Sequence, residues 1–367
     1  SGRCRGCVGQ NMVTMEIRAI AADAIILASG GCGAIFGRST NSVACTGSAV
    51  SRVFQAGARY ANGEFVQVHP TAIPGADKLR LISESARGEG GRVWVPSKPQ
   101  DARPPGDIPD KERYYFLEER YPEYGNLVPR DIATREIFNV CVREGLSVEA
   151  DRMCVYLDVT HLPRDVLDRK LAGILEIYEK YQGVDPRDTA MKIFPAVHYS
   201  MGGLWCDYDR TAEGGLNVGS PRNQQTNVPG LFAIGECDYQ FHGANRLGAN
   251  SLVACIFSGL TVAPGVVGYV NNLPQGAADD QRASLYESAS REHRSSYQAL
   301  LARPEGGPNP YRIHGELGEL MTRAATVVRH NDELEAAYGR VCELEEAAGR
   351  ASLSDKSPWA NQNAVFA

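Results

Sequence analysis

Positive charge is in short supply in this sequence. Its 38 lysine and arginine residues are outnumbered by 44 aspartate and glutamate residues, and the formal net charge is -6. A nucleic-acid-binding protein carries a basic patch that contacts phosphates, so this composition argues against a nucleic-acid partner. The chain also shows no secretory signal, no internal repeat and no low-complexity tract. Its 367 residues, 43% of them hydrophobic, suffice for several structural units and a substantial core.

A paired-cysteine framework is absent as well. The ten cysteines are scattered along a long chain without a secretory signal, which favours mostly buried, reduced thiols in a reducing compartment. Cys4 and Cys7 form a CxxC motif, but no second pair follows at the spacing of a zinc site. The sequence therefore predicts no metal centre.

Charged side chains are missing from residues 247–278, the longest such run in the chain. A membrane-spanning helix needs ~20 apolar residues, so the length alone would allow one. The run is nevertheless interrupted by small and polar residues, namely Ser258, Gly259, Thr261, Pro264, Gly265 and Gly268. We expect a buried helix that begins near Ser251 and is broken around Pro264, and no transmembrane segment.

Two apolar strands far apart in the sequence indicate an α/β fold. In VTMEIRAIAADAIILASGG, a strand of alternating polarity is followed by a fully apolar strand, residues 24–28, that runs into a Gly-Gly pair. The pattern recurs in VPGLFAIGECD, where residues 231–234 run into Gly235 and Glu236. Apolar runs that end in glycine are typical of buried parallel strands bordering a ligand crevice. The sequence thus predicts one α/β domain interrupted by a large insertion.

The composition of the remaining segments fits an insertion and a helical end. Residues 92–130 are rich in proline and charge, which predicts surface loop, and helix-like stretches follow at 132–144 and 164–181. After Gln275, apolar residues recur at three- and four-residue spacing, which predicts amphipathic helices.

Histidines and arginines gather beside glycines in a few short stretches. These are QVHPTAI with His69, SESARGEGGRV with Ser83, Glu84, Arg87, Glu89 and Arg92, VPRDIATR with Arg130 and Asp131, AVHYSMGG with His198, and HGANRLGANSL with His242 and Arg246. Arginine grips a carboxylate through two parallel hydrogen bonds, and histidine adds orientable donors. Together these residues suit a small dianion.

Each stretch taken alone also has a purely structural explanation. His69 before Pro70 can simply end a strand, and Glu84 with Arg87 can form an exposed helical ion pair worth a few tenths of a kcal/mol. Asp131 favours the positive end of a helix dipole. Arg246, set among small residues, either braces a turn or holds an anion.

A helix start at Ser251 and Leu252 suggests a second kind of ligand. Its free backbone N–H groups and positive dipole end would favour an anion or an electron-rich ring, as in a flavin. The carboxylate of Glu236, at the end of an apolar strand, could then bind a cofactor hydroxyl.

Four motifs closely resemble the flavoprotein subunit of succinate dehydrogenases and fumarate reductases: QVHPTAIPG, SESARGEGGRVW, HYSMGG and PGLFAIGECDYQFHGANRLGANSL. The resemblance runs through nearly the whole chain. It implies an α/β fold, α+β overall, in which an FAD-binding Rossmann-like domain (1–68 and 198–272) is interrupted by a capping domain (69–197) and followed by a C-terminal helical domain (273–367). The stretch ANGEFVQVHPTAIPGADKLRLISESARGEGGRVW is most similar to bacterial subunits that work with a diheme membrane anchor and menaquinone.

The resemblance also implies roles for individual residues. The residues that match dicarboxylate ligands are His69, Ser83, His198 and Arg246. Those that match the proton-transferring arginine and its relay to solvent are Arg130, Glu84 and Arg87. Those that match cofactor contacts are Gly30, Gly31, Ser48, Glu236, Ser251 and Leu252.

The implied reaction interconverts succinate and fumarate by hydride transfer to FAD, with proton transfer via Arg130. Electrons would pass to an iron–sulfur subunit, a membrane cytochrome b anchor and quinone, at the cytoplasmic side of the bacterial inner membrane. A free guanidinium keeps its proton up to about pH 12, so an arginine in this role needs a dry site with clustered positive charge.

The sequence departs from the family pattern in several places. It contains neither the GxGxxG dinucleotide fingerprint nor the histidine to which FAD is covalently attached. Both are expected upstream of Ser1, so we expect an internal fragment that is inactive alone. Ser48 stands where many relatives carry aspartate, and Ser83 where many carry threonine, although a hydroxyl can still donate.

Two other functions remain open. L-Aspartate oxidase shares the fold and much of the site, and only the IPG and DKLRL stretches after His69 argue against it. A non-catalytic flavoprotein remnant is the second alternative. It is disfavoured because His69, Glu84, Arg87, Arg130, His198 and Arg246 are all retained.

Overall fold

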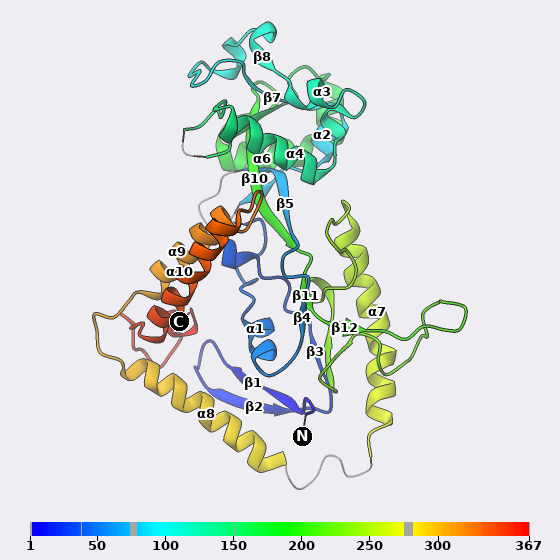
Figure 1. Ribbon diagram of the computed structural model, residues 1–367, viewed down its shortest axis with the longest axis vertical. Helices are drawn as coiled ribbons and strands as arrows, with labels where there is room; N and C mark the ends of the chain where they lie inside the picture. The colour runs from blue at the N-terminus through cyan, green and yellow to red at the C-terminus, as the bar shows by residue number, and fades with distance from the viewer. Residues whose placement is uncertain (1, 38, 74–78, 151, 275–281, 367) are drawn as a thin grey trace.

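Two long antiparallel strands connect the two bodies of the molecule. The chain enters the upper body of Figure 1 along β5 (Val66–Ile73) and leaves it along β10 (Met191–Ser200). We call residues 66–200 the inserted body and the remainder the base. The computed structural model describes residues 2–37, 39–73, 79–150, 152–274 and 282–366. Its mixture of helices and sheets confirms the predicted fold class, while part of the DKLRL stretch lies outside the described residues.

A six-stranded sheet, in the order β6-β5-β10-β9-β7-β8, organises the inserted body. Its other strands are β6 (Arg80–Leu81), β7 (Arg92–Pro96), β8 (Arg113–Tyr114) and β9 (Val155–Asp158). The helices of this body are α2 (Ser85–Gly88), α3 (Phe116–Arg120), α4 (Arg130–Phe138), α5 (Arg164–Val166) and α6 (Ala172–Gln182). Leu157 of β9 shares one buried cluster with Ile137 of α4 and Leu175 of α6, so the helices cover the sheet and close its core.

The helices predicted at 132–144 and 164–181 are confirmed. A π-helical turn at Asn139–Arg143 continues α4, and another at Leu167–Leu171 joins α5 to α6. The surface loop predicted for 92–130 is wrong, because this segment contains β7 and α3 and buries Trp94 and Phe116 completely.

Charged side chains of residues 92–130 find partners within the segment, which explains why the prediction of a surface loop was wrong. Arg92 forms a two-bond ion pair with Glu118, at 2.8 and 2.7 Å, and its guanidinium lies 3.5 Å from the centroid of the Tyr115 ring. Charge and proline content therefore did not keep the segment on the surface.

A four-stranded sheet, in the order β12-β13-β14-β3, lies in the base. Its strands are β3 (Ile25–Leu27), β12 (Cys206–Asp207), β13 (Gln225–Thr226) and β14 (Leu231–Ala233). β3 and β14 pair in parallel, with Ile25 opposite Leu231, so the two predicted apolar strands are neighbours. The expectation that β3 is buried is wrong: it is an edge strand of this sheet, and Ile26 is 43% exposed.

Smaller elements complete the base. They are the hairpin β1 (Gly6–Gln10) and β2 (Ile17–Ala21), the pair β4 (Tyr60–Ala61) and β11 (Gly203–Leu204), helix α1 (Ser48–Gln55), and the 3-10 turns η1 (Gly33–Phe36) and η7 (Gly235–Cys237). None of the ten cysteines, all of which lie in the described residues, forms a disulfide. The expectation that most are buried is wrong, since only Cys141, Cys154, Cys206 and Cys237 are.

Helix α7 (Asn250–Asn271) differs from its prediction in two ways. It runs unbroken through Pro264, and only one face is buried while Leu252, Ile256 and Leu260 are 63–73% exposed. Proline cannot bond the carbonyl four residues earlier, which here belongs to Leu260 on the exposed face, where solvent can satisfy it. By length and composition α7 is also the one described helix that could span a membrane, a property shared by core helices of many proteins.

The predicted amphipathic helices follow at the end of the chain. They are α8 (Arg282–Ala302), α9 (Pro310–Ala324), α10 (Asn331–Gly349) and α11 (Gln362–Phe366). α9 packs against η1 through two glycines: a Cβ on Gly318 would lie 2.4 Å from the Cα of Gly37. This contact fixes the helical end to the base beside the start of β5 (Figure 1).

Candidate active site

The β5–β10 ladder presents several polar side chains to one site because its register is irregular. His69 does not end β5, which continues through Pro70 to Ile73. On β10, Val197 pairs with Val68 and Tyr199 pairs with Gln67, so His198 is an extra residue, a β-bulge. A bulge re-aims the side chains around it. Here it brings the His198 ring to 5.1 Å from the His69 ring, between centroids.

His69 is fully buried and keeps one ring nitrogen without a partner. Its Nδ1 accepts a hydrogen bond of 3.2 Å from the backbone N–H of Thr71, so in the neutral ring the proton is on Nε2. That Nε2 has no hydrogen-bond partner among the described residues. Burial, reinforced by the charges of Arg130 and by His198, holds the pKa of His69 well below its usual value. His69 therefore presents a neutral, unsatisfied donor.

His198 is held by a residue that the sequence analysis missed. Its Nδ1 lies 2.6 Å from the hydroxyl of Thr40 in the base. Burial and the nearby charges of Arg246 and Arg130 lower the pKa of His198 to about 4. Both histidines are thus neutral near pH 7, and the positive charge of the site comes from arginines.

Arg130 begins α4 directly after Pro129 and is held on two sides. Its Nε and Nη2 donate to the two oxygens of Glu84, at 2.9 and 3.0 Å, and its Nη1 donates to Oε1 of Gln67 at 3.0 Å. Arg87 Nη2 donates to the same Glu84 carboxylate at 3.2 Å. The three predicted catalytic residues therefore form one continuous line of charged hydrogen bonds.

The middle of this line is more exposed than its two ends, since the Arg130 side chain is only 10% exposed. The Arg87 side chain is only 4% exposed and donates to the carbonyls of Asn126 and Val128, whereas the Glu84 side chain is 35% exposed. Burial alone would raise the pKa of Glu84, but the hydrogen bond and charge of Arg130, with Arg87, bring it below its ordinary value. Burial lowers the pKa of Arg87. Glu84 is thus an ionised carboxylate that reaches solvent.

Arg246 is buried, and the described residues leave the end of its fork free. Its Nε donates to Oε1 of Gln67 at 3.1 Å, and its guanidinium lies 4.5 Å from the centroid of the Tyr199 ring. No described residue bonds to its two terminal nitrogens. Burial and the charge of Arg130 lower its pKa. Arg246 therefore does not serve only to brace a turn, since its anion-binding end is unoccupied by protein groups.

The small residues after Arg246 allow its loop to approach the Glu84–Arg130 pair. A Cβ on Gly248 would lie 2.8 Å from Oε2 of Glu84 and 3.3 Å from Nη2 of Arg130. The loop from the base and the helix start from the inserted body are therefore in close contact, and larger residues would push them apart.

Other candidates from the sequence do not join this group. The hydroxyl of Ser83 bonds to the N–H and hydroxyl of Ser85, and no hydrogen bond of the described residues links it to the histidines or arginines. Glu89 pairs with Lys170, and Arg92 with Glu118. His242 packs edge-on against Tyr199, with ring centroids 5.3 Å apart. Of these, only His242 lies beside the site, through Tyr199.

Three of the predicted cofactor residues, Gly30, Gly31 and Glu236, follow the two parallel strands of the base. Glu236 accepts hydrogen bonds from the Ser200 N–H at 2.9 Å and from Asn41, and a Cβ on Gly31 would lie 2.3 Å from its Oε1. Gly30, the residue before Gly31, has a left-handed backbone conformation, with φ of 74°. Burial raises the pKa of Glu236, partly offset by those hydrogen bonds. The backbone of Gly31 and the carboxylate of Glu236 are therefore in direct contact, and a residue larger than glycine would not fit at position 31.

The start of α7 is an uncapped helix end. Its N-cap, Ala249, is left-handed, with φ of 63°, and provides no side-chain hydrogen bond to the first N–H groups. Those N–H groups and the exposed Leu252 fit an electron-rich, apolar ring such as that of a flavin. Together with the glycines and Glu236, this set fits part of an FAD site, while the GxGxxG fingerprint that holds the diphosphate is not in the sequence.

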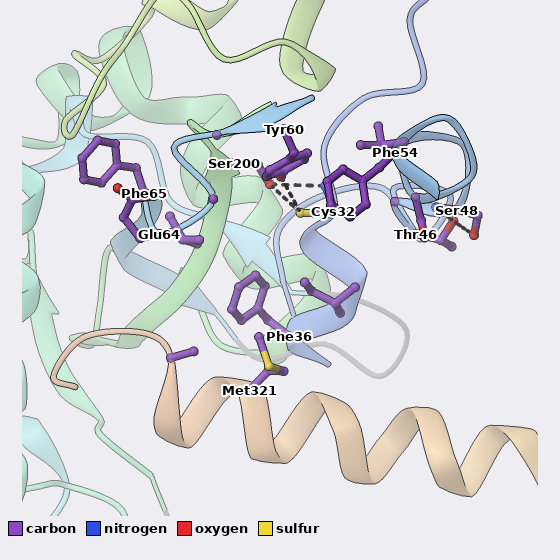
Figure 2. Close-up of a pocket in the computed structure, with 18 of the residues that line it drawn as sticks. Cys32, Phe36, Thr46, Ser48, Phe54, Tyr60, Glu64, Phe65, Ser200 and Met321 are labelled. Atoms are coloured by element: carbon purple, nitrogen blue, oxygen red, sulfur yellow. Dashed lines mark hydrogen bonds between the residues drawn. The ribbon is translucent and has the colours of Figure 1, made fainter. Parts of the chain in front are cut away.

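Ser48 lies on a separate cavity of about 770 Å³. Figure 2 shows it beside Thr46, with Cys32, Tyr60 and Ser200 on the facing wall. Its hydroxyl lies 2.8 Å from that of Thr46. The other predicted cofactor residues do not line this cavity, although Ser200, which accepts a hydrogen bond from the Cys32 N–H, joins it to Glu236.

Comparison with known proteins identifies the family of this chain. Residues 1–252 match the model of the FAD binding domain family, and residues 314–367 match that of the fumarate reductase flavoprotein C-terminus. The succinate dehydrogenase flavoprotein subunit of Bacillus subtilis is 53% identical over 363 residues, which cover 99% of this chain and 57% of that protein. The fumarate reductase flavoprotein subunit of Escherichia coli is 30% identical over 369 residues, covering 100% of this chain and 56% of that protein.

A solved structure is similar over the whole chain. A mutant of the FrdA chain of Escherichia coli quinol fumarate reductase superposes with a TM-score of 0.83 at 28% identity, covering 100% of this chain and 58% of that one. The chain thus spans little more than half the length of the relatives that it matches. It belongs to the family of FAD-binding flavoproteins that includes the flavoprotein subunits of succinate dehydrogenases and fumarate reductases.

Proposed function

We propose that this chain forms the dicarboxylate-binding and proton-transferring part of a flavoprotein subunit that interconverts succinate and fumarate. One observation carries the proposal: Arg246, whose fork is free, is tied through Gln67 to Arg130, and the unpartnered Nε2 donor of His69 belongs to the residue two positions after Gln67 on the same strand. A buried donor without a partner costs about 1–3 kcal/mol, so the site is built for an acceptor that comes from outside the chain. A small dianion supplies such acceptors.

The proposed binding residues divide the two carboxylates between them. Arg246 grips one carboxylate through its two terminal nitrogens, a charge-assisted geometry that lysine could not reproduce. His69 and His198, both neutral, donate hydrogen bonds that orient the substrate without adding charge. Ser83 is retained as a binding candidate that would have to turn away from Ser85 to reach the substrate.

The proposed chemical role of the chain is to move a proton. When bound, FAD supplies the two-electron acceptor that takes a hydride from one carbon of succinate. Arg130 exchanges the proton of the neighbouring carbon, and the ionised Glu84, bonded to Arg130 and open to solvent, passes that proton to water, with Arg87 holding Glu84 in place.

The proposed cofactor contacts are Gly30, Gly31, Ser48, Glu236, Ser251 and Leu252, and a covalent histidyl link to FAD is part of the same proposal. We further propose that the intact protein passes electrons through an iron–sulfur subunit to a membrane cytochrome b anchor and quinone, of the menaquinone-linked diheme type. The structural neighbours, which include quinol-fumarate reductases, support such partners. The protein would then lie on the cytoplasmic side of a bacterial inner membrane.

Anaerobic titration of the intact FAD-loaded protein tests the function. Succinate is expected to bleach the flavin absorbance, and L-aspartate is not. Bleaching by L-aspartate would instead assign an L-aspartate oxidase. No bleaching by either, with FAD bound, would mean that the Arg246 fork holds another anion, and failure to bind FAD would favour a non-catalytic remnant.

A further inference from the structure

Gln67 links the two arginines that the proposed function treats separately. Its Oε1 accepts hydrogen bonds from Arg130 Nη1 at 3.0 Å and from Arg246 Nε at 3.1 Å. Its Nε2 donates to the backbone carbonyl of Arg246 at 2.6 Å. Because guanidinium nitrogens only donate and a carbonyl only accepts, one orientation of the amide satisfies all three contacts.

The position of Gln67 explains why it can make these contacts. It lies two residues before His69 on β5, so both side chains point to the same face of the strand, and it is only 4% exposed. Arg130 belongs to α4 of the inserted body, and Arg246 to the loop before α7 of the base. The buried Gln67 side chain therefore accepts a hydrogen bond from one arginine of each body.

The amide is neutral, and its neutrality has a consequence. A carboxylate at this position could accept the same two hydrogen bonds, but it would form ion pairs that compensate the positive charges. An amide oxygen holds two like-charged groups close together while leaving both charges available to a bound anion.

We infer that Gln67 is a positioning residue for the proposed reaction: it sets the separation of Arg130 and Arg246 and preserves their charge for the dicarboxylate. This inference rests on the proposed function. The inference assigns two properties to the Gln67 side chain: its acceptor oxygen fixes the positions of the arginines, and its neutrality permits substrate binding. Each property can be removed by a different substitution.

The test compares Gln67→Met and Gln67→Glu in the intact FAD-loaded protein. Methionine keeps the volume and removes the acceptor, so kcat is expected to fall at least about tenfold, since hydrogen bonds to charged groups are lost on both arginines. Glutamate keeps an acceptor oxygen and adds a charge, so the Kd for fumarate, measured by calorimetry, and the KM for succinate are expected to rise at least about tenfold. We expect kcat to fall less in Gln67→Glu than in Gln67→Met.

Gln224→Met is the matched control, because Gln224 is also buried and its side chain bonds to Gln240 and Cys206 and to neither arginine. All three variants are also compared by thermal unfolding. Opposite patterns in the two Gln67 variants, one mainly in kcat and one mainly in KM and Kd, would support the inference, since a role in folding alone would not split them. Values within twofold of the control, or parallel losses in both variants, would overturn it. If the wild-type protein neither binds fumarate nor reacts with succinate, the proposed function itself fails.

Discussion

The inserted body and the base differ in how completely their apolar side chains are buried around the proposed ligand contacts. In the inserted body, Leu157, Ile137 and Leu175 close a continuous core under α4 and β9, and the polar groups above it are tied to one another. In the base, α7 and the edge strand β3 leave apolar side chains such as Leu260 and Ile26 exposed, on the two elements whose ends carry residues proposed to contact FAD. The proposed substrate contacts are therefore fixed by the chain's own packing, whereas the cofactor side is not closed by it.

The largest effect is expected at the arginine that bonds to both Glu84 and Gln67. Arg130→Ala should lower turnover by about 10²–10⁴-fold, the usual contribution of a positioned acid–base group, and leave FAD binding unchanged because none of its hydrogen bonds reaches the cofactor residues. Steady-state kinetics and flavin absorbance measure both. Arg135→Ala, on the exposed face of the same helix, is the control. Residual activity within tenfold of wild type would sink the proton-transfer role.

The difference in packing itself can be tested by paired truncations. Leu157→Ala should destabilise the protein by ~2–5 kcal/mol because it opens a cavity in a closed core. Leu260→Ala, on the exposed face of α7, should change the free energy of unfolding by no more than ~0.5 kcal/mol. Urea denaturation of the two variants provides the comparison. Similar losses in both would show that the exposed face of α7 is packed in solution.

A buried carboxyl gives the base a pH dependence. Burial raises the pKa of Asp238 to about 7, and its Oδ2 has no partner among the described residues. Its stabilising contribution is full below the unfolded pKa, near 4, and is lost as pH rises through the folded pKa. The wild type should lose ~2 kcal/mol of stability between pH 5 and pH 8 relative to Asp238→Asn, as thermal unfolding at each pH would measure. Parallel pH curves for the two proteins would contradict the assignment.

The last prediction concerns the contact between the C-terminal helices and the base. Gly318→Ala should destabilise by ~1–3 kcal/mol because its Cβ would overlap Gly37. Gly315→Ala, one turn earlier in α9, has no atom within 4 Å of the new Cβ and should stabilise by up to ~1 kcal/mol. Differential scanning calorimetry separates the two. A neutral Gly318→Ala would mean that α9 packs less tightly against η1.

Much of the fold was readable from the sequence where one signal dominated. Continuous apolar runs predicted β3 and β14, and three- and four-residue spacing predicted α8 to α10. Predictions failed where contacts in the folded protein offset the local preference of a residue. Pro264 does not break α7 because the carbonyl it frees faces outward, and the charged segment 92–130 folds inward because its arginines find partners.

The site was predictable to a similar degree. Arg130, Glu84 and Arg87 were predicted by resemblance, and the structure joins them by hydrogen bonds, while their roles remain proposals. Gln67 and Thr40 were missed because one polar residue in a strand or loop carries no distinctive spacing. Gln67 lies between two arginines because β5 packs against α4 and against the loop before α7, which only the tertiary structure shows.

His198 is inserted into β10 as an extra residue. In a regular strand, His198 and Tyr199 would face opposite sides of the sheet; here His198 meets His69, and Tyr199 lies under Arg246. The pairs on either side of the insertion, Val197 with Val68 and Tyr199 with Gln67, are those of an uninterrupted ladder, so deleting His198 would leave the later residues of β10 on their present sides. A one-residue deletion would therefore remove one histidine from the proposed site while the sheet and the contact of Tyr199 with Arg246 stay in place.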